Sequence, residues 1–207
     1  MSLIDNLQNY RHTIDECQDY IDYAHQRYAS GRYKLKNNLR IFISESSFLK
    51  MFIAWERFLE SCFIDYLMDE PSIQNNRPAK FANPINVQHA QELLKGTKKY
   101  VDWANPEITR QLSKIYFHQG YVFNSQLSSI QNDLFDLKTI RNSAAHLSST
   151  TSSKLDALST RLLNRSCHNF SAYNLLFSTN PQGSAGQTIL DYYKNILDIS
   201  AEIIANG

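Results

Sequence analysis

Apolar residues recur at steps of three and four along most of this chain, and this helical periodicity limits its possible folds more than any other feature. Between residues 3 and 28 the apolar positions follow one side of a helix: Leu3, Leu7, Tyr10, Ile14, Cys17, Ile21 and Ala24. A longer helical pattern runs from about Leu35 to Met68 and stops before Pro71. We expect these two segments to pack against each other as a long antiparallel helix hairpin.

Shorter helices are predicted after a loop over residues 71–86, which contains three prolines. One helix covers Val87 to Leu94 and is closed by Gly96. The next begins at Asn105-Pro106-Glu107, because Asn can cap the first turn, Pro needs no backbone donor there, and an acid suits the positive helix end. We expect this helix to reach about Phe117.

Three more helices complete the prediction. One runs from Asn124 or Ser125 to about His146. Another covers Lys154 to Leu163, with Ser153 and Asp156 as its capping pair. The last is amphipathic, and its apolar side is formed by Ile189, Tyr192, Ile196, Ile199 and Ile203. No strand pair and no internal repeat stands out, so we predict an all-α helical bundle that forms a single domain over residues 1–207.

Several classes of function are excluded by what the chain lacks. Charged residues interrupt every apolar stretch, so none approaches the roughly 20 residues of a membrane span. The start of the chain lacks a secretory signal, and we expect a cytoplasmic protein without a membrane partner. Cys17, Cys62 and Cys167 are far apart, which predicts buried free thiols. No phosphate loop or metal-binding motif occurs, so neither a cofactor nor a metal is expected.

Charge is distributed unevenly along the chain. Residues 71–170 carry 12 Lys or Arg against 6 Asp or Glu, whereas both flanking segments are acidic. This basic centre is compatible with a phosphate-bearing partner and equally with a solvated face. Asp133 and Asp136 stand three apart, but no further ligand is near them, and a solvated polar edge explains them better than a metal site.

Arg141 and His146 form the one candidate catalytic set, together with the intervening Asn142. Five positions separate the two residues, about 140° on an ideal helix, so they share a site only if the helix ends between them. A histidine can move the proton of a ribose 2′-hydroxyl, and a guanidinium can stabilise charge on the phosphate. One histidine cannot be base and acid at once, but a two-fold dimer would supply a second copy.

The spacing alone is weak, because Arg161 and His168 form a second match of the same kind. A structural alternative is also open for the first pair. Arg141 could form an ion pair with a helix neighbour, and His146 could simply meet the negative end of its helix.

The segment from Ile140 to His146, preceded by a long helix bearing Phe52, Ala54-Trp55-Glu56 and Phe58-Leu59-Glu60, resembles the HEPN superfamily (higher eukaryotes and prokaryotes nucleotide-binding). More narrowly, it is similar to HEPN-like nucleases of bacterial toxin–antitoxin and phage-defence loci. Their signature is Arg, a polar residue that is often Asn, a few variable residues, and then His. The resemblance covers roughly residues 35–165.

This resemblance implies a dimeric helical bundle that cleaves RNA as a metal-independent endoribonuclease, kept in check by a cognate antitoxin protein. Arg141 would stabilise the phosphate, His146 would be the acid–base group, and Asn142 would orient the site. Glu56 and Glu60, one turn apart, would be assisting acids, although we favour ion pairing with Arg or Lys as their role. A non-catalytic HEPN-type module that binds nucleotide or RNA, or scaffolds a partner, is the alternative function.

Overall fold

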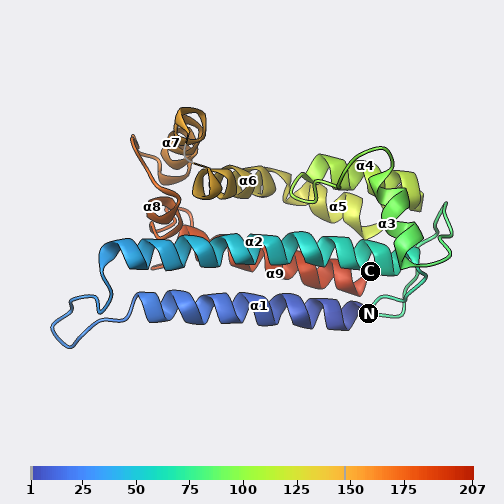
Figure 1. The fold of residues 1–207 in the computed structure, drawn as a ribbon, viewed down its shortest axis with the longest axis horizontal. Coiled ribbons are helices and arrows are strands. Elements are labelled where there is room, and N and C mark those ends of the chain that lie inside the picture. The colour runs from blue at the N-terminus through green and yellow to red at the C-terminus, as the bar shows by residue number, and fades with distance from the viewer. Residues whose placement is uncertain (1, 147) are drawn as a thin grey trace. The chain divides into compact units, whose positions relative to one another are not determined.

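A computed structural model describes residues 2–146 and 148–207, and every regular element in these ranges is a helix (Figure 1). The prediction of an all-α protein is therefore confirmed for the described residues. In chain order the elements are α1 (Leu3–Ala24), α2 (Asn37–Leu67), α3 (Val87–Lys95), α4 (Pro106–Tyr116), the short 3₁₀ helix η1 (His118–Gly120), α5 (Tyr121–Ser129), α6 (Gln131–Ala145), α7 (Ser149–Leu163), α8 (Ala172–Leu176) and α9 (Ile189–Asn206). None of these helices is long and apolar enough to cross a membrane.

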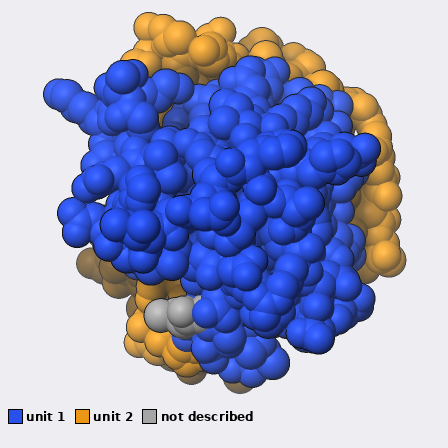
Figure 2. Space-filling view, turned by 90° about the vertical axis from the view of Figure 1, so that its right-hand side faces the viewer, with its two compact units in different colours: residues 1–11, 55–135, 196–207 blue, residues 12–54, 136–195 orange. Residues whose placement is uncertain are grey.

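The chain divides into two compact units, each made of segments that are distant in sequence (Figure 2). Unit 1 comprises Met1–Arg11, Trp55–Phe135 and Ile196–Gly207. Unit 2 comprises His12–Ala54 and Asp136–Asn195. A single domain over the whole chain remains a prediction.

Unit 1 is built around an aromatic cluster centred on Phe63 of α2. The Phe63 ring centroid lies 4.9 Å from those of Phe117 and Phe123 and 5.6 Å from that of Trp103. These rings come from α2, α5 and the segments that flank α4, and burying them removes a large apolar area from water. Aromatic residues therefore form much of the interior of this unit.

The first part of α1 runs antiparallel to α2 within unit 1. Asn6 donates a hydrogen bond to the Asp65 carboxylate at 2.7 Å, and the Tyr10 ring lies 5.4 Å from that of Phe58. Residue numbers rise along α1 as they fall along α2, which defines the direction. Burial raises the pKa of the Asp65 carboxyl above its usual value.

Unit 2 is tied together by polar contacts between helices. Lys50 of α2 pairs with Glu16 of α1 at 3.0 Å. Asp136 of α6 accepts hydrogen bonds from Arg161 of α7 at 2.5 Å and from the Tyr193 hydroxyl of α9 at 3.2 Å. This one carboxylate therefore links three helices of the unit.

The single helix predicted from residue 124 or 125 to 146 is wrong, because two helices occupy this region. Helix α5 begins earlier, at Tyr121, and the backbone leaves helical geometry at Ile130 (φ −109°, ψ 20°) before α6 begins. The Ser129 hydroxyl donates to the Gln126 carbonyl at 2.7 Å and so competes for an acceptor that would continue the helix. Both predicted ends near Gly96 and His146 agree with the structure to within one residue.

The predicted cap of the helix that ends at Leu163 is also wrong. Helix α7 begins five residues earlier than predicted, at Ser149, and Ser148 and Thr151 form a reciprocal capping box. The Asp156 carboxylate instead accepts the backbone N–H groups of Asn169 and Phe170 at 3.0 and 2.8 Å. Asp156, which was predicted to cap the helix, therefore binds the loop at Asn169 and Phe170 instead.

The predicted apolar side of α9 is partly exposed, because Ile199 is 59% exposed. The buried side of α9 instead includes Leu190, Tyr193 and Leu197. Helix α8 was not predicted, because five residues are too few to show a clear period.

Candidate functional site

The last turn of α6 carries Arg141 and Asn142 on the edge of unit 2. Leu137 and Ile140 on the same helix are fully buried, and Ser143 is nearly so. Because these residues face the interior, the helical period places Arg141 and Asn142 beside the buried face of α6, where both are half-buried. The two side chains are therefore anchored by a packed helix and still reach solvent.

Arg141 is held by a neutral neighbour. Its Nη1 donates a hydrogen bond to the Asn142 Oδ1 at 3.1 Å. In the described parts of the chain, no carboxylate lies within ion-pair distance of this guanidinium. The alternative interpretation of Arg141 as an ion pair with a helix neighbour is therefore wrong, and its charge stays available to an anion.

His146 lies directly after the end of the helix. Helix α6 ends at Ala145, so Arg141 lies in its last turn and His146 is the first residue after it. The His146 backbone N–H donates to the Asn142 carbonyl at 3.0 Å, and its own carbonyl accepts the Thr151 hydroxyl at 2.7 Å. The imidazole is exposed.

The Asn142 side chain accepts a hydrogen bond from the Arg141 guanidinium. Its carbonyl accepts the backbone N–H of His146, which is the ordinary helical bond between residues four apart and involves neither side chain. No hydrogen bond joins the side chains of Arg141 and His146 directly among residues 2–146 and 148–207. The described residues thus offer a cation and an imidazole whose side chains are not hydrogen-bonded to each other.

The second Arg–His match has structural partners instead. Arg161 pairs with Asp136, and the His168 ring makes a 3.0 Å hydrogen bond with the Ser166 hydroxyl. Two sets with similar spacing are therefore distinguished by their partners, since one arginine is committed to a carboxylate and the other is not. Asp136 does not belong to a solvated polar edge as predicted, because it anchors α7 and α9 and its side chain is only 14% exposed.

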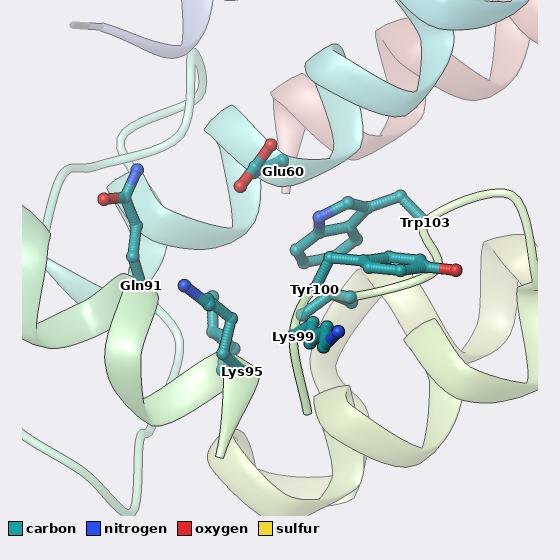
Figure 3. Close-up of a pocket in the computed structure, with 8 residues that line it drawn as sticks. Glu60, Gln91, Lys95, Lys99, Tyr100 and Trp103 are labelled. Atoms are coloured by element: carbon teal, nitrogen blue, oxygen red, sulfur yellow. The ribbon is translucent and has the colours of Figure 1, made fainter. Parts of the chain in front are cut away.

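Glu56 and Glu60 lie on the part of α2 that belongs to unit 1, whereas Arg141, Asn142 and His146 belong to unit 2. Both glutamates are half-buried. Glu60 lines a cavity of about 340 Å³, together with residues of α3 and of the segment that follows it (Figure 3). This local setting makes Glu60 a candidate ligand-binding residue of the cavity.

The cavity beside Glu60 combines charge with aromatic surface. Lys95 and Lys99 supply ammonium groups, and the buried Trp103 and the exposed Tyr100 supply rings. In Figure 3 the Lys95 and Glu60 side chains extend toward the same opening, and the Tyr100 ring lies beside that of Trp103. A ligand with a flat ring, an anionic group and a hydrogen-bond donor would match these groups.

Sequence reasoning did not single out this cavity. Trp103 is buried and is also part of the aromatic cluster around Phe63. The run Lys95-Gly96-Thr97-Lys98-Lys99-Tyr100 was the available signal, since it concentrates cations beside an aromatic residue.

The cysteines and acids of the described residues form no metal-binding group. Cys17, Cys62 and Cys167 are buried free thiols, as predicted. Burial raises the pKa of the Cys17 and Cys62 thiols, which keeps them protonated and unreactive near neutral pH.

Comparison of the chain with protein-family models, with curated proteins and with solved structures finds no match. The resemblance to HEPN nucleases therefore rests on the residues from Ile140 to His146 and on the long helix before them.

Proposed function

We propose that this protein is a metal-independent endoribonuclease of HEPN-like type, which cleaves RNA through attack of a ribose 2′-hydroxyl on the adjacent phosphate. The uncompensated Arg141 guanidinium is the observation that carries this proposal. It stands in the last turn of α6, five positions before the exposed His146, and is held by a neutral amide. A permanent cation in that setting suits a phosphate on which negative charge accumulates.

The reaction needs two proton transfers. One His146 imidazole accepts the proton of the 2′-hydroxyl while its oxygen attacks phosphorus, and a protonated imidazole donates to the departing 5′-oxygen. The products are a 2′,3′-cyclic phosphate and a 5′-hydroxyl end. Because DNA lacks the 2′-hydroxyl, the proposed activity is restricted to RNA.

The proposed active form is a homodimer built on a HEPN-like antiparallel hairpin. A two-fold interface would set the His146 of each subunit opposite that of its twin, so that one copy acts as base and the other as acid. Asn142 orients Arg141 through its side-chain amide. We further propose a cytoplasmic toxin or phage-defence effector, whose cognate antitoxin protein covers the basic site.

The test is cleavage of a labelled RNA by the purified full chain in the presence of a chelator. Arg141→Ala and His146→Ala should each lower the cleavage rate at least about a hundredfold. Arg165→Ala and His168→Ala are matched controls, because both side chains are exposed and outside the proposed site. They should cleave like the wild type, and the products should carry cyclic phosphate ends.

Cleavage that persists in both site variants, or that is absent from all five proteins, overturns the proposal. Analytical ultracentrifugation of the same preparations tests the dimer. A monomer that retains full cleavage activity would contradict the shared site.

A non-catalytic nucleotide-binding module is the second candidate function, and the cavity beside Glu60 favours it. Its volume of about 340 Å³ lies within the range of small-molecule sites, and Lys95 with Lys99 suits a phosphate. Calorimetric titration with nucleoside monophosphates, on wild type and on Lys95→Ala/Lys99→Ala, distinguishes it. Nucleotide binding lost in that variant, without RNA cleavage by the wild type, would favour this candidate over the nuclease.

A further inference from the structure

The segment between α1 and α2 concentrates positive charge without any acid. From Tyr23 to Ser44 the chain contains no Asp or Glu. Five cations fall within residues 25–40, which we call the basic loop: Arg27, Arg32, Lys34, Lys36 and Arg40. The whole basic loop belongs to unit 2, the unit that also contains Arg141 and His146.

Backbone hydrogen bonds order the basic loop. The Tyr28 N–H donates to the Arg32 carbonyl at 2.8 Å, and the Lys34 N–H donates to the Gln26 carbonyl at 2.9 Å. Gly31 takes a left-handed conformation (φ 81°) that permits the tight turn between them. A folded turn presents its side chains with less loss of entropy on binding than a flexible segment would.

Two guanidinium groups of the loop are fixed on one aromatic ring. The guanidinium carbon of Arg27 lies 3.8 Å from the centroid of the Tyr33 ring, and that of Arg40 lies 3.7 Å from it. Arg40 also donates from Nε to the Tyr173 hydroxyl at 3.0 Å. Rings and hydroxyls hold these cations in place but leave their positive charge uncompensated.

The five cations form no ion pairs in the described parts of the chain. Other cations of the protein do, as Lys50 of unit 2 does with Glu16 at 3.0 Å. Five uncompensated charges within the basic loop, which extends into the first turn of α2, create a local positive potential that favours a partner with repeated negative charge.

Exposed aromatic rings accompany these charges. Tyr28 within the loop and Tyr23 at the end of α1 are each 57% exposed. Nucleotide bases stack on such rings and on guanidinium planes only when they are unpaired, because a duplex hides the faces of its bases. An acidic protein surface would use the cations but not the rings.

We propose that the basic loop is a binding site for single-stranded RNA, in which the cations contact successive phosphates and Tyr28 stacks on a base. The choice of RNA as the strand rests on the proposed nuclease function. The site itself is separate from Arg141 and His146, and it would hold the strand that those residues cleave.

The experiment measures binding of a fluorescent 12-nucleotide single-stranded RNA by anisotropy over a range of salt concentrations. The full-length His146→Ala protein is used, so that cleavage does not consume the probe. Arg32→Glu/Lys36→Glu in this background reverses two exposed loop cations. Lys154→Glu/Arg165→Glu is the matched control, because it changes the net charge equally at exposed positions of the same unit.

We expect the loop variant to bind at least about tenfold more weakly than the control variant. The slope of log affinity against log salt concentration should be smaller in magnitude by about 1.4, because each lost phosphate contact on a single strand reduces that slope by about 0.7. Tyr28→Ala should weaken binding about 5- to 150-fold, as expected for loss of one stacked base. Phe81→Ala, which removes an exposed ring from unit 1, should bind like the parent.

Equal affinities for the loop and control variants overturn the proposal. So does tighter binding of a duplex of the same length, or displacement of the RNA by polyglutamate of equal charge, which would indicate an acidic protein partner. Should Arg32→Glu/Lys36→Glu melt early, Arg32→Ala/Lys36→Ala replaces it. Binding that depends on the loop while the wild type cleaves nothing would refute the nuclease and leave the RNA site standing.

Discussion

Replacing Asn142 by Asp tests the role of the Arg141 charge with a change of almost no volume. The wild-type amide accepts a hydrogen bond from Arg141 at 3.1 Å and carries no charge. In Asn142→Asp a carboxylate takes the same place and forms an ion pair with the guanidinium. If Arg141 stabilises a phosphate, this internal anion will compete with it.

The size of the effect follows from the geometry. A donor–acceptor distance of 3.1 Å places the two charge centres about 4 Å apart, where their attraction is about 1 kcal/mol in water and about 4 kcal/mol near a protein surface. Both side chains are half-buried, so solvent screening keeps the competition well below the upper figure. At about 1.4 kcal/mol per factor of ten, we expect kcat/KM for RNA cleavage to fall about tenfold to a hundredfold.

Stability should change little. An acid near a helix C-terminus costs about 0.3–1 kcal/mol, and the new ion pair offsets part of this. The melting temperature should therefore shift by less than about 4 °C, measured by circular dichroism.

Asn142→Ser provides the control, because it removes the amide oxygen that accepts the Arg141 hydrogen bond and adds no charge. It should lose less activity than Asn142→Asp in the same RNA cleavage assay with chelator present. Wild-type activity in the Asp variant, or an equal loss in both variants, would refute the argument that the free charge of Arg141 drives the reaction.

Three further predictions concern stability. In denaturant titrations, Asp65→Asn should become more stable relative to the wild type as the pH rises from 4 to 7. Burial raises the pKa of Asp65, so the folded state prefers the protonated carboxyl, and the wild type loses stability as that carboxyl ionises. A difference that shrinks as the pH rises would contradict this prediction. Asn105→Ala should lower the unfolding free energy by about 1 kcal/mol, since it removes the side-chain acceptor for the Glu107 N–H, and an unchanged urea midpoint would contradict it. Gly120→Ala should lower the unfolding free energy by more than about 1 kcal/mol in the same titration. Gly120 has φ 78°, and a Cβ there would lie 2.6 Å from the Cβ of Asn124. A variant as stable as the wild type would contradict this prediction.

Local rules predicted the elements whose signals lie within one turn of the chain. The start of α4 is an example, because Asn105 caps it through a bond to a residue two positions away. Period and length likewise identified α1, α2 and α9. Where the local rules failed, the cause is physical. The apolar period continues unbroken through Ile130, but the helix stops there, where the Ser129 hydroxyl competes for a backbone acceptor.

Features that depend on partners distant in sequence required the structure. The Asp156 carboxylate binds backbone groups 13 and 14 residues away, so no local rule reveals that it is unavailable as a cap. The ring of Tyr33 and the hydroxyl of Tyr173, 133 residues from Arg40, together hold that guanidinium. Sequence patterns cannot show such pairings, because they arise when the chain folds back on itself.

The sequence by itself determined that this chain is helical and that an arginine, an asparagine and a histidine stand together where a helix stops, because backbone capping and periodicity act over a few residues. Only the tertiary structure decided which charges are neutralised. It gave Arg161 a carboxylate 25 residues away and left Arg141 and the basic loop without one, since ion pairing depends on distances in space rather than along the chain.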